Sequence, residues 1–122
     1  MITHMKFASI PVRDQDRALK FYVEKLGFKV EADIPFENRQ RWIKLSTPEG
    51  KTRVVLFTFP EQEDRIGTPS NVVFATKDVQ KTYEELQQKG VEFVSKPVAE
   101  SWGTYAQFKD PDGNLFILSS ED

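Results

Sequence analysis

The sequence predicts an α+β fold of two similar βαβββ modules, and an internal repeat is the main observation behind this prediction. Residues 7–14 read FASIPVRD and residues 71–78 read NVVFATKD, so each is an apolar strand that ends in a basic residue followed by Asp. A helical pattern and three further strand-like runs follow each copy, at an offset of about 64 residues. We expect module one at residues 1–60, a charged, turn-rich linker at 61–69 and module two at 70–122, within a single domain 1–122.

Each module contains one predicted helix with a start signal and a stop signal. Asp14 and Asp78 are placed to cap the helices, because an Asp side chain accepts hydrogen bonds from free N–H groups of the first turn. Gly27 and Gly90 end the helices, since a left-handed C-terminal cap favours glycine. Between these signals apolar residues recur at helical spacing, at Ala18, Phe21, Tyr22 and Leu26 and at Val79, Tyr83 and Leu86.

Tight turns join the last two strands of each module. TPEG at residues 47–50 connects strand-like runs at 41–46 and 53–59. DPDG at residues 110–113 connects runs at 104–109 and 115–119 in the same way. Proline fixes one backbone angle and glycine accepts a positive φ, so both tetrapeptides are typical of turns. Shorter strands are expected directly after the helices, at 28–30 and 91–94.

Composition limits the classes of function. The 122 residues are 39% hydrophobic and 30% charged, as in a soluble globular domain, and the net charge is -2 with no basic face for nucleic acid. The absence of cysteine excludes disulfides, thiolate metal sites and cysteine nucleophiles. No apolar run reaches the ~18 residues of a membrane span, and the N-terminus lacks the pattern of a signal peptide. We therefore expect a cytoplasmic protein.

Several short motifs resemble one known family. The chain carries VRD at 12–14, FY at 21–22, LGF at 26–28 and FKDPDGN at 108–114. With these motifs it resembles the vicinal oxygen chelate superfamily of glyoxalase I, extradiol dioxygenases, fosfomycin resistance enzymes and bleomycin resistance proteins. The resemblance implies that the two modules curl into half-barrels and form a cup. It also implies a homodimer, because small members commonly cover their open sheet edges by pairing two chains.

The resemblance also marks the positions at which metal-dependent relatives bind their ion. Those enzymes use His, Gln or Glu, early in the first strand and on the last strand of each module. The matching positions here are Phe7, Leu56, Asn71 and Ile117, and three of these have no lone pair while an amide is a weak ligand. A shift of one residue gives no better donors, at Val55 or Phe57 and at Phe116 or Leu118. We therefore expect no metal and no other cofactor.

Other catalytic groups are scarce. His4 is the only histidine. It lies three residues before Phe7, and because strand neighbours alternate faces, this odd spacing directs it away from the cup. We expect His4 to be a surface residue, and the alternative is a ligand or catalytic role. With one histidine and no cysteine, a Ser-His-Asp or Cys-His arrangement is not available. Acid–base chemistry would depend on Asp, Glu, Lys or a tyrosine such as Tyr105.

Two tryptophans and three acids have alternative interpretations. Trp42 and Trp102 each open a strand, and they belong either to the core or to the wall of a ligand cleft, where flat rings stack on planar ligands. Glu31, Asp33 and Glu37 form either a solvated edge or an acidic rim for a cationic ligand.

Strand alternation predicts which residues face the cup. The cup face is expected to carry Phe7, Ser9, Val54, Leu56, Thr58, Asn71, Val73 and Ile117. The opposite face should pack on the helices, with Ala8, Ile10, Val55, Phe57, Val72, Phe74, Phe116 and Leu118. The predicted ligand-binding residues are Phe7, Ser9, Trp42, Leu56, Thr58, Asn71, Val73, Trp102, Tyr105 and Ile117. The same composition also fits a cup that is filled by its own side chains.

Two functions remain open. The first is a metal-free protein, similar to bleomycin resistance proteins, that binds an apolar or aromatic small molecule. The second is an enzyme of the glyoxalase, dioxygenase or lyase type, which uses either a divalent metal or metal-free acid–base chemistry. The missing metal ligands favour the binding protein, with a small molecule and a second copy of the chain as its partners.

Overall fold

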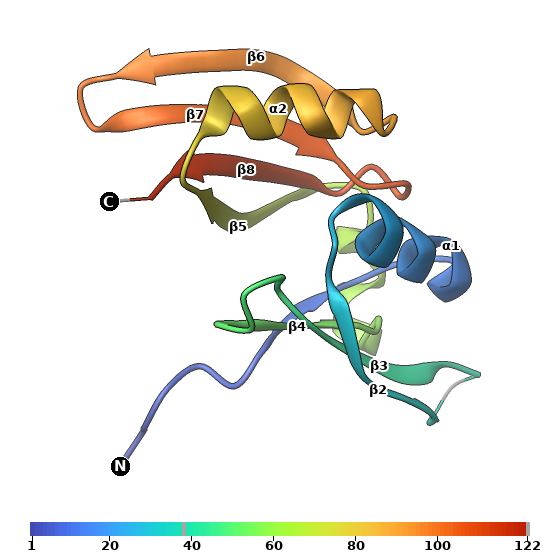
Figure 1. The fold of residues 1–122 in the computed structure, drawn as a ribbon. Coiled ribbons are helices and arrows are strands. Elements are labelled where there is room, and N and C mark those ends of the chain that lie inside the picture. The colour runs from blue at the N-terminus through green and yellow to red at the C-terminus, as the bar shows by residue number, and fades with distance from the viewer. Residues whose placement is uncertain (38, 122) are drawn as a thin grey trace. The chain divides into compact units, whose positions relative to one another are not determined.

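The computed structural model describes residues 1–37 and 39–121, and the chain divides into two compact units, Met1–Ile66 and Gly67–Asp122 (Figure 1). Each unit contains a four-stranded sheet, and each runs in the order strand, helix and three strands. The predicted α+β class with two βαβββ modules is therefore confirmed. The boundary between the units falls inside the expected linker.

Unit one contains a mixed sheet in the order β1-β4-β3-β2, in which β1 and β4 are parallel and the other pairs are antiparallel. Its first helix widens into a π-helix in its second half, where Phe21 and Tyr22 are buried. The elements are β1 (Ala8–Ile10), α1 (Gln15–Lys20), the π-helix η1 (Phe21–Lys25), β2 (Lys29–Pro35), β3 (Arg41–Ser46), β4 (Arg53–Leu56) and the 3-10 helix η2 (Pro60–Arg65).

Unit two repeats this topology. Its sheet has the order β5-β8-β7-β6, again with one parallel pair, β5 and β8, and two antiparallel pairs. The elements are β5 (Pro69–Thr76), α2 (Val79–Gln88), β6 (Glu92–Glu100), β7 (Gly103–Lys109) and β8 (Leu115–Ser120). The repeat in the sequence thus corresponds to a repeat in strand order.

The predicted helix caps form as expected. The Asp14 side chain accepts a hydrogen bond from the backbone N–H of Arg17 at 3.1 Å, and that of Asp78 accepts one from Lys81 at 3.0 Å. Gly27, directly after the first helical segment, has a φ of 77°, in the left-handed region where a side chain would be strained. Local capping chemistry therefore fixes where each helix begins and ends.

Each sheet buries one face against its helix. In unit one this face carries Ile10, Ile43, Leu45, Val54 and Leu56, all buried. In unit two it carries Ala106, Phe108, Phe116 and Leu118, also buried. Burying a side chain of this size stabilises a fold by about 1.5–3 kcal/mol. These two faces form a large part of the apolar core of their units, together with buried helix residues such as Tyr22 and Val79.

The DPDGN turn between β7 and β8 is held by its own side chains. Asp110 Oδ1 accepts from the backbone N–H groups of Asp112 at 2.9 Å and Asn114 at 3.0 Å, and its Oδ2 accepts from Asn114 Nδ2 at 2.9 Å. Asn114 Oδ1 accepts from the backbone N–H of Gly67 at 2.8 Å. The turn therefore also fixes the first residue of unit two.

Strand β4 is shorter than predicted, because it ends at Leu56 instead of continuing to residue 59. Beyond this point side-chain amides replace a neighbouring strand. Gln40 Nε2 donates to the carbonyl of Thr58 at 2.9 Å, and Gln40 Oε1 accepts from the N–H of Thr58 at 2.8 Å. Gln15 Nε2 donates to the carbonyl of Leu56 at 2.6 Å. The backbone stays extended here without strand pairing.

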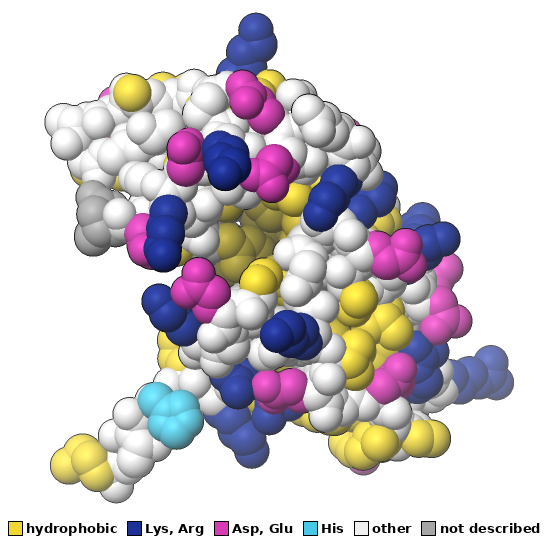
Figure 2. All heavy atoms as spheres, viewed as in Figure 1, with side chains coloured by type: hydrophobic (Ala, Val, Ile, Leu, Met, Phe, Trp, Pro, Cys, Tyr) yellow, Lys and Arg dark blue, Asp and Glu magenta, His cyan; other side chains and the backbone are white. Residues whose placement is uncertain are grey.

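Acidic and basic side chains are interspersed over the face of the protein shown in Figure 2. His4 precedes β1 and lies in an exposed N-terminal segment. Over residues 1–37 and 39–121, none of the helices has the length and apolar character needed to cross a membrane.

Candidate functional site

Strand pairing fixes which residues share a face in unit one, because directly paired residues project to the same side of a sheet. Ala8 pairs with Val54 and Ile10 with Leu56, so these four residues share the buried helix face. The prediction that Val54 and Leu56 lie on the open face is therefore wrong by one residue. Alternation divides the residues of a strand into two sets, one for each face of the sheet. Only the pairing register of β4 against β1 shows which of the two sets faces the helix.

The open face of unit one carries Ser9 and Val55, which pair with each other, and alternation continues this face to Phe57. Lys44 pairs with Val55 from the other side, so it also lies on this face, as does Trp42 two residues earlier. The prediction that Val55 and Phe57 pack on the helix is wrong for the same reason of register.

Five aromatic rings gather on this open face. We call this set the aromatic cluster, and it consists of Phe7, Phe36, Trp42, Phe57 and Phe59. The Trp42 ring centre lies 5.4 Å from those of Phe7 and Phe57, 5.5 Å from that of Phe36 and 6.3 Å from that of Phe59. Phe57 and Phe59 are 4.9 Å apart. These distances are typical of favourable edge-to-face and tilted contacts, with Trp42 in the middle.

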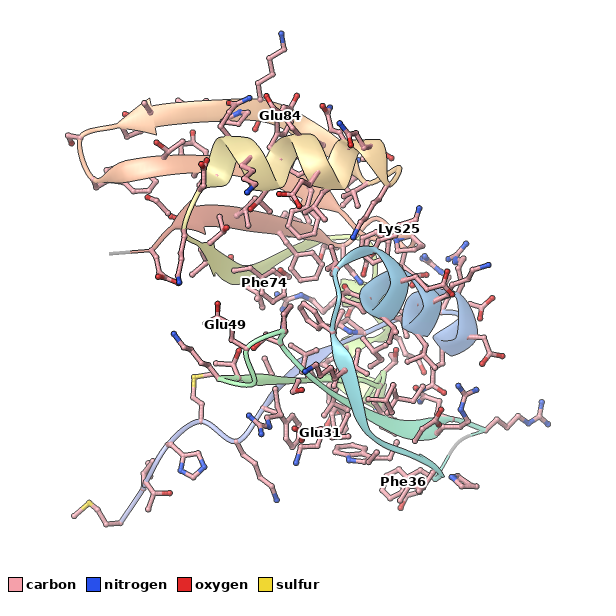
Figure 3. The ribbon with its side chains drawn as sticks, in the orientation of Figure 1. Lys25, Glu31, Phe36, Glu49, Phe74 and Glu84 are labelled. Carbon is pink, nitrogen blue, oxygen red and sulfur yellow. The ribbon has the colours of Figure 1, made fainter. Side chains whose placement is uncertain are left out.

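The aromatic cluster is partly open to solvent. Phe57 is 2% exposed, whereas Phe36 is 50% exposed at the end of β2. Figure 3 shows Phe36 on the side of the unit-one sheet away from α1. Ile34, which pairs with Trp42 across β2 and β3, adds another exposed apolar side chain. An apolar surface of this kind, with an anchored base and an open rim, is typical of a small-molecule or partner site.

Two predicted polar members of the site are occupied by hydrogen bonds. Ser9 Oγ accepts from Gln62 Nε2 at 3.1 Å. The buried Thr58 hydroxyl donates to the carbonyl of Val12 and accepts from its N–H, both at 2.8 Å. Thr58 therefore links the segment after β1 to the segment after β4. It lies two residues after Leu56, so alternation places it on the same helix face as Leu56.

The acids of β2 are paired with arginines. Glu31 accepts from Arg53 through both carboxylate oxygens, at 3.1 Å from Nε and 3.0 Å from a terminal nitrogen. Asp33 accepts from Arg41 Nε at 2.8 Å, and this hydrogen bond is the largest influence that raises the pKa of Arg41. Glu31 and Asp33 are therefore neutralised locally, which favours the solvated-edge interpretation over an acidic rim.

A polar cleft of about 700 Å³ lies beside the start of α1. Its lining residues are Val12, Arg13, Asp14, Gln15, Asp16, Arg39, Gln40, Arg41, Thr58, Glu63 and Ile66. Of the predicted ligand-binding residues it contains Thr58, and its glutamines hold backbone groups of β3 and β4. The cleft is thus separate in composition from the aromatic cluster.

Unit two has an open face of its own, on the side of the sheet away from α2. Val73 and Gln107 both pair with Ile117, and Tyr105 pairs with Ser119 two residues further on, so these residues share one face, as predicted for Val73 and Ile117. Val73 is 56% exposed. Their part in ligand binding remains a prediction.

Two further predicted site residues lie at irregular points of unit two. Trp102, 59% exposed in the turn before β7, stacks on Tyr105 with ring centres 5.4 Å apart and planes inclined by 20°. Asn71 has a φ of 64° in the left-handed region, at the shift of register between β5 and β8. Strand alternation does not fix the face of Asn71 at such a point, so its place on the open face remains a prediction.

The sequence analysis missed three members of the aromatic cluster, Phe36, Phe57 and Phe59. The available signal was the number of phenylalanines, ten in 122 residues. Phe57 was assigned to the helix face because the register of β4 was taken one residue out. Phe36 lies after β2, and that strand is longer than the sequence suggested.

The residues at the family's four metal positions do not fit a metal ion. With the observed register, the metal position on β4 falls on Val55 instead of Leu56, and both side chains are aliphatic. The other three positions remain Phe7, Asn71 and Ile117, which are poor metal ligands. In the part of the chain that the structure describes, no three His, Cys, Asp or Glu side chains gather in a way that could hold an ion.

Comparisons with known proteins agree with the observed fold. The model of the glyoxalase/bleomycin resistance protein/dioxygenase superfamily matches residues 2–118. The uncharacterized protein YetH of Bacillus subtilis is 35% identical over 118 residues, which is 97% of this chain and 98% of YetH. The crystal structure of TnmS3, an antibiotic binding protein from Streptomyces sp. CB03234, superposes with a TM-score of 0.88 at 35% identity, over 99% of this chain and 98% of TnmS3. Lactoylglutathione lyase GLX1 of Arabidopsis thaliana is 33% identical over 88% of this chain, but over only 40% of its own length.

Proposed function

The chain belongs to the glyoxalase/bleomycin resistance protein/dioxygenase superfamily, and from this membership we propose that it binds an apolar, aromatic small molecule without a metal ion. The proposed binding surface is the aromatic cluster around Trp42. The similarity to TnmS3, which is described as an antibiotic binding protein, supports binding without turnover.

The observation that carries this proposal is the contrast between the rings of the aromatic cluster. Phe57 is buried and fixes the base of the cluster, while Phe36 leaves half of its surface to solvent. A planar ligand that covers the exposed ring area gains both apolar burial and aromatic stacking, the latter worth about 0.5–1.5 kcal/mol per ring pair. We propose the open face of unit two, with Val73, Tyr105 and Ile117, and Trp102 in the turn beside it, as a second and separate surface for such a ligand.

The metal-free part of the proposal follows from the donor set. Phe7, Val55, Asn71 and Ile117 occupy the positions where metal-dependent relatives place imidazole or carboxylate groups. Aliphatic and phenyl side chains cannot coordinate a divalent ion, so these positions would serve apolar contact within their own units instead.

A fluorescence titration with the neutral aromatic probe N-phenyl-1-naphthylamine tests the proposal. We expect saturable binding to the wild-type chain, and Trp42→Ala should weaken it at least about tenfold, because a central stacking surface is lost. Trp42→Phe should retain part of the affinity. Val94→Ala is the control, since it removes an exposed apolar side chain from β6. Equal affinities of wild type and Trp42→Ala would refute the site.

An enzyme of the glyoxalase or lyase type is the second candidate, and the similarity to lactoylglutathione lyase GLX1 favours it. Such an enzyme would need a metal that the four positions do not support, or acid–base chemistry by groups such as Tyr105. Consumption of substrate by the purified chain with no added metal would favour this candidate over the binding protein.

We further propose that the protein works in the cytoplasm as a homodimer with no nucleic-acid partner. Strands β2 and β6 are the edges opposite the parallel pairs of the two sheets, and pairing of chains is a common way to cover such edges. Sedimentation equilibrium that gives the mass of one 14.1 kDa chain would contradict the dimer.

A further inference from the structure

The open face of unit one carries a positive charge beside the aromatic cluster. Lys44 lies two residues from Trp42 on β3, and alternation puts both side chains on the same face. Lys44 also pairs with Val55 and Ala32 in the neighbouring strands, which places it in the interior of the sheet surface and not at an edge. Lys44 therefore presents a cation on the same face as the rings of the aromatic cluster.

Lys44 has only a weak protein partner. Among the described residues its one ion pair runs from Nζ to Glu31 Oε1 at 4.0 Å, which is beyond hydrogen-bond distance. Glu31 is already engaged by Arg53 through both of its carboxylate oxygens, at 3.1 and 3.0 Å. Two cations thus share one anion among these three side chains.

The other acid of β2 does not change this balance. Asp33 bonds to Arg41 at 2.8 Å, and its strand partner is Ile43 of the buried face. The Lys44 side chain is 27% exposed, so part of its stem is covered, and a bound anion would give its ammonium group a closer charged partner than Glu31.

We infer that the ligand of the aromatic cluster is an aromatic anion, whose acidic group binds Lys44 while its ring stacks on Trp42. Two residues along a strand span about 6.6 Å, which matches a fused or linked ring system that carries one carboxylate, sulfonate or ionised phenol. This inference rests on the proposed function and makes Lys44 its specificity-determining residue. It also argues against a cationic ligand.

Two fluorescent probes separate charge from ring stacking. 8-Anilinonaphthalene-1-sulfonate and N-phenyl-1-naphthylamine share the same aromatic skeleton, and only the first has a sulfonate. We expect Lys44→Gln to weaken binding of the sulfonate probe about five- to tenfold and to change that of the neutral probe less than about twofold, since only one charge-assisted contact is lost. Lys44→Arg should keep most of the affinity for the sulfonate probe.

The matched control is Lys51→Gln in the turn between β3 and β4. Lys51 is in the same unit and is 72% exposed, with Glu49 at 3.5 Å. We expect it to leave both probes unchanged. The inference is overturned if Lys44→Gln affects both probes equally or neither, or if Lys51→Gln has the same effect as Lys44→Gln.

The variant Trp42→Ala distinguishes a failure of this inference from a failure of the proposed function. It should weaken both probes, because both need the ring surface. If Trp42→Ala has no effect on either probe, the proposed function itself fails. If Trp42→Ala weakens both and Lys44→Gln weakens neither, only the aromatic anion is wrong. Circular dichroism melting of each variant confirms that the folded chain is compared.

Discussion

Thr58 shows how one side chain can join two segments that do not pair as strands. Its hydroxyl both donates to and accepts from the backbone of Val12, at 2.8 Å in each case, and it is buried. Gln40 satisfies the Thr58 backbone from the other side. A residue predicted to touch ligand therefore supports the strand end that carries Phe57 and Phe59.

Thr58→Val tests this role at nearly constant volume. The substitution leaves the Val12 N–H and carbonyl without the hydroxyl, and a buried unsatisfied polar group costs about 1–3 kcal/mol. We expect the free energy of unfolding to fall by that amount in urea denaturation. Thr52→Val, in the exposed turn between β3 and β4, is the matched control and should change it by less than about 0.5 kcal/mol. Equal effects of the two substitutions would contradict the assignment.

At the scale of elements, the DPDGN turn is the clearest case of a local signal that specifies structure. Asp110 and Asn114 are both buried, and each satisfies backbone groups that would otherwise be unpaired. The turn positions β8, which lies in the middle of the unit-two sheet between β5 and β7. Its hydrogen bonds therefore support the whole of unit two.

Asn114→Ala should destabilise the protein by about 2–4 kcal/mol, because it removes one hydrogen bond to the buried Asp110 carboxylate and one to the backbone N–H of Gly67. Thermal unfolding followed by circular dichroism measures the loss. Asn71→Ala is the comparison at an exposed asparagine, and it should cost only the roughly 1 kcal/mol of an alanine in the left-handed region, because no buried hydrogen bond is lost. A stability of Asn114→Ala close to that of wild type would show that the turn is not held by this side chain.

Features of the sequence that act locally were predicted well. The caps at Asp14 and Asp78, the glycine stops and the DPDGN turn each depend on residues a few positions apart. The faces of β4 were wrong, because they depend on the register of Val55 against Ser9, more than 40 residues away in the chain. Phe57 was missed for the same reason, and Phe36 because β2 is longer than its sequence suggests, whereas Phe7 and Trp42 of the aromatic cluster were predicted.

At the scale of the whole molecule, both units have the same strand order, one parallel pair of strands and an α-helix after the first strand. The two differ in what their open faces carry, an aromatic cluster with Lys44 in unit one and a pair formed by Trp102 and Tyr105 in unit two. A shared topology therefore supports two chemically different surfaces, and the function depends on the side chains and not on the fold.

Divalent metals should leave the stability of the chain unchanged. A metal at 100 times its dissociation constant would stabilise the folded state by about 2.7 kcal/mol, which corresponds to a shift of several degrees in Tm. With Zn²⁺, Ni²⁺, Mn²⁺ or Fe²⁺ we expect a shift of less than about 1 °C. Elemental analysis of the purified protein is the second readout. A stoichiometric transition metal or a rise of several degrees would favour the enzyme instead.

The hydrogen bond between Asn114 and Gly67 has a consequence for engineering the chain. Gly67 has a φ of 83°, and a Cβ atom there would lie 3.0 Å from the carbonyl oxygen of Asp112, so almost any substitution is strained. A segment that resembles a free linker in the sequence is in fact anchored at this residue. A tag or a longer spacer between the units would therefore have to be inserted upstream of Gly67, because an insertion after it would pull β5 away from the turn that closes its sheet.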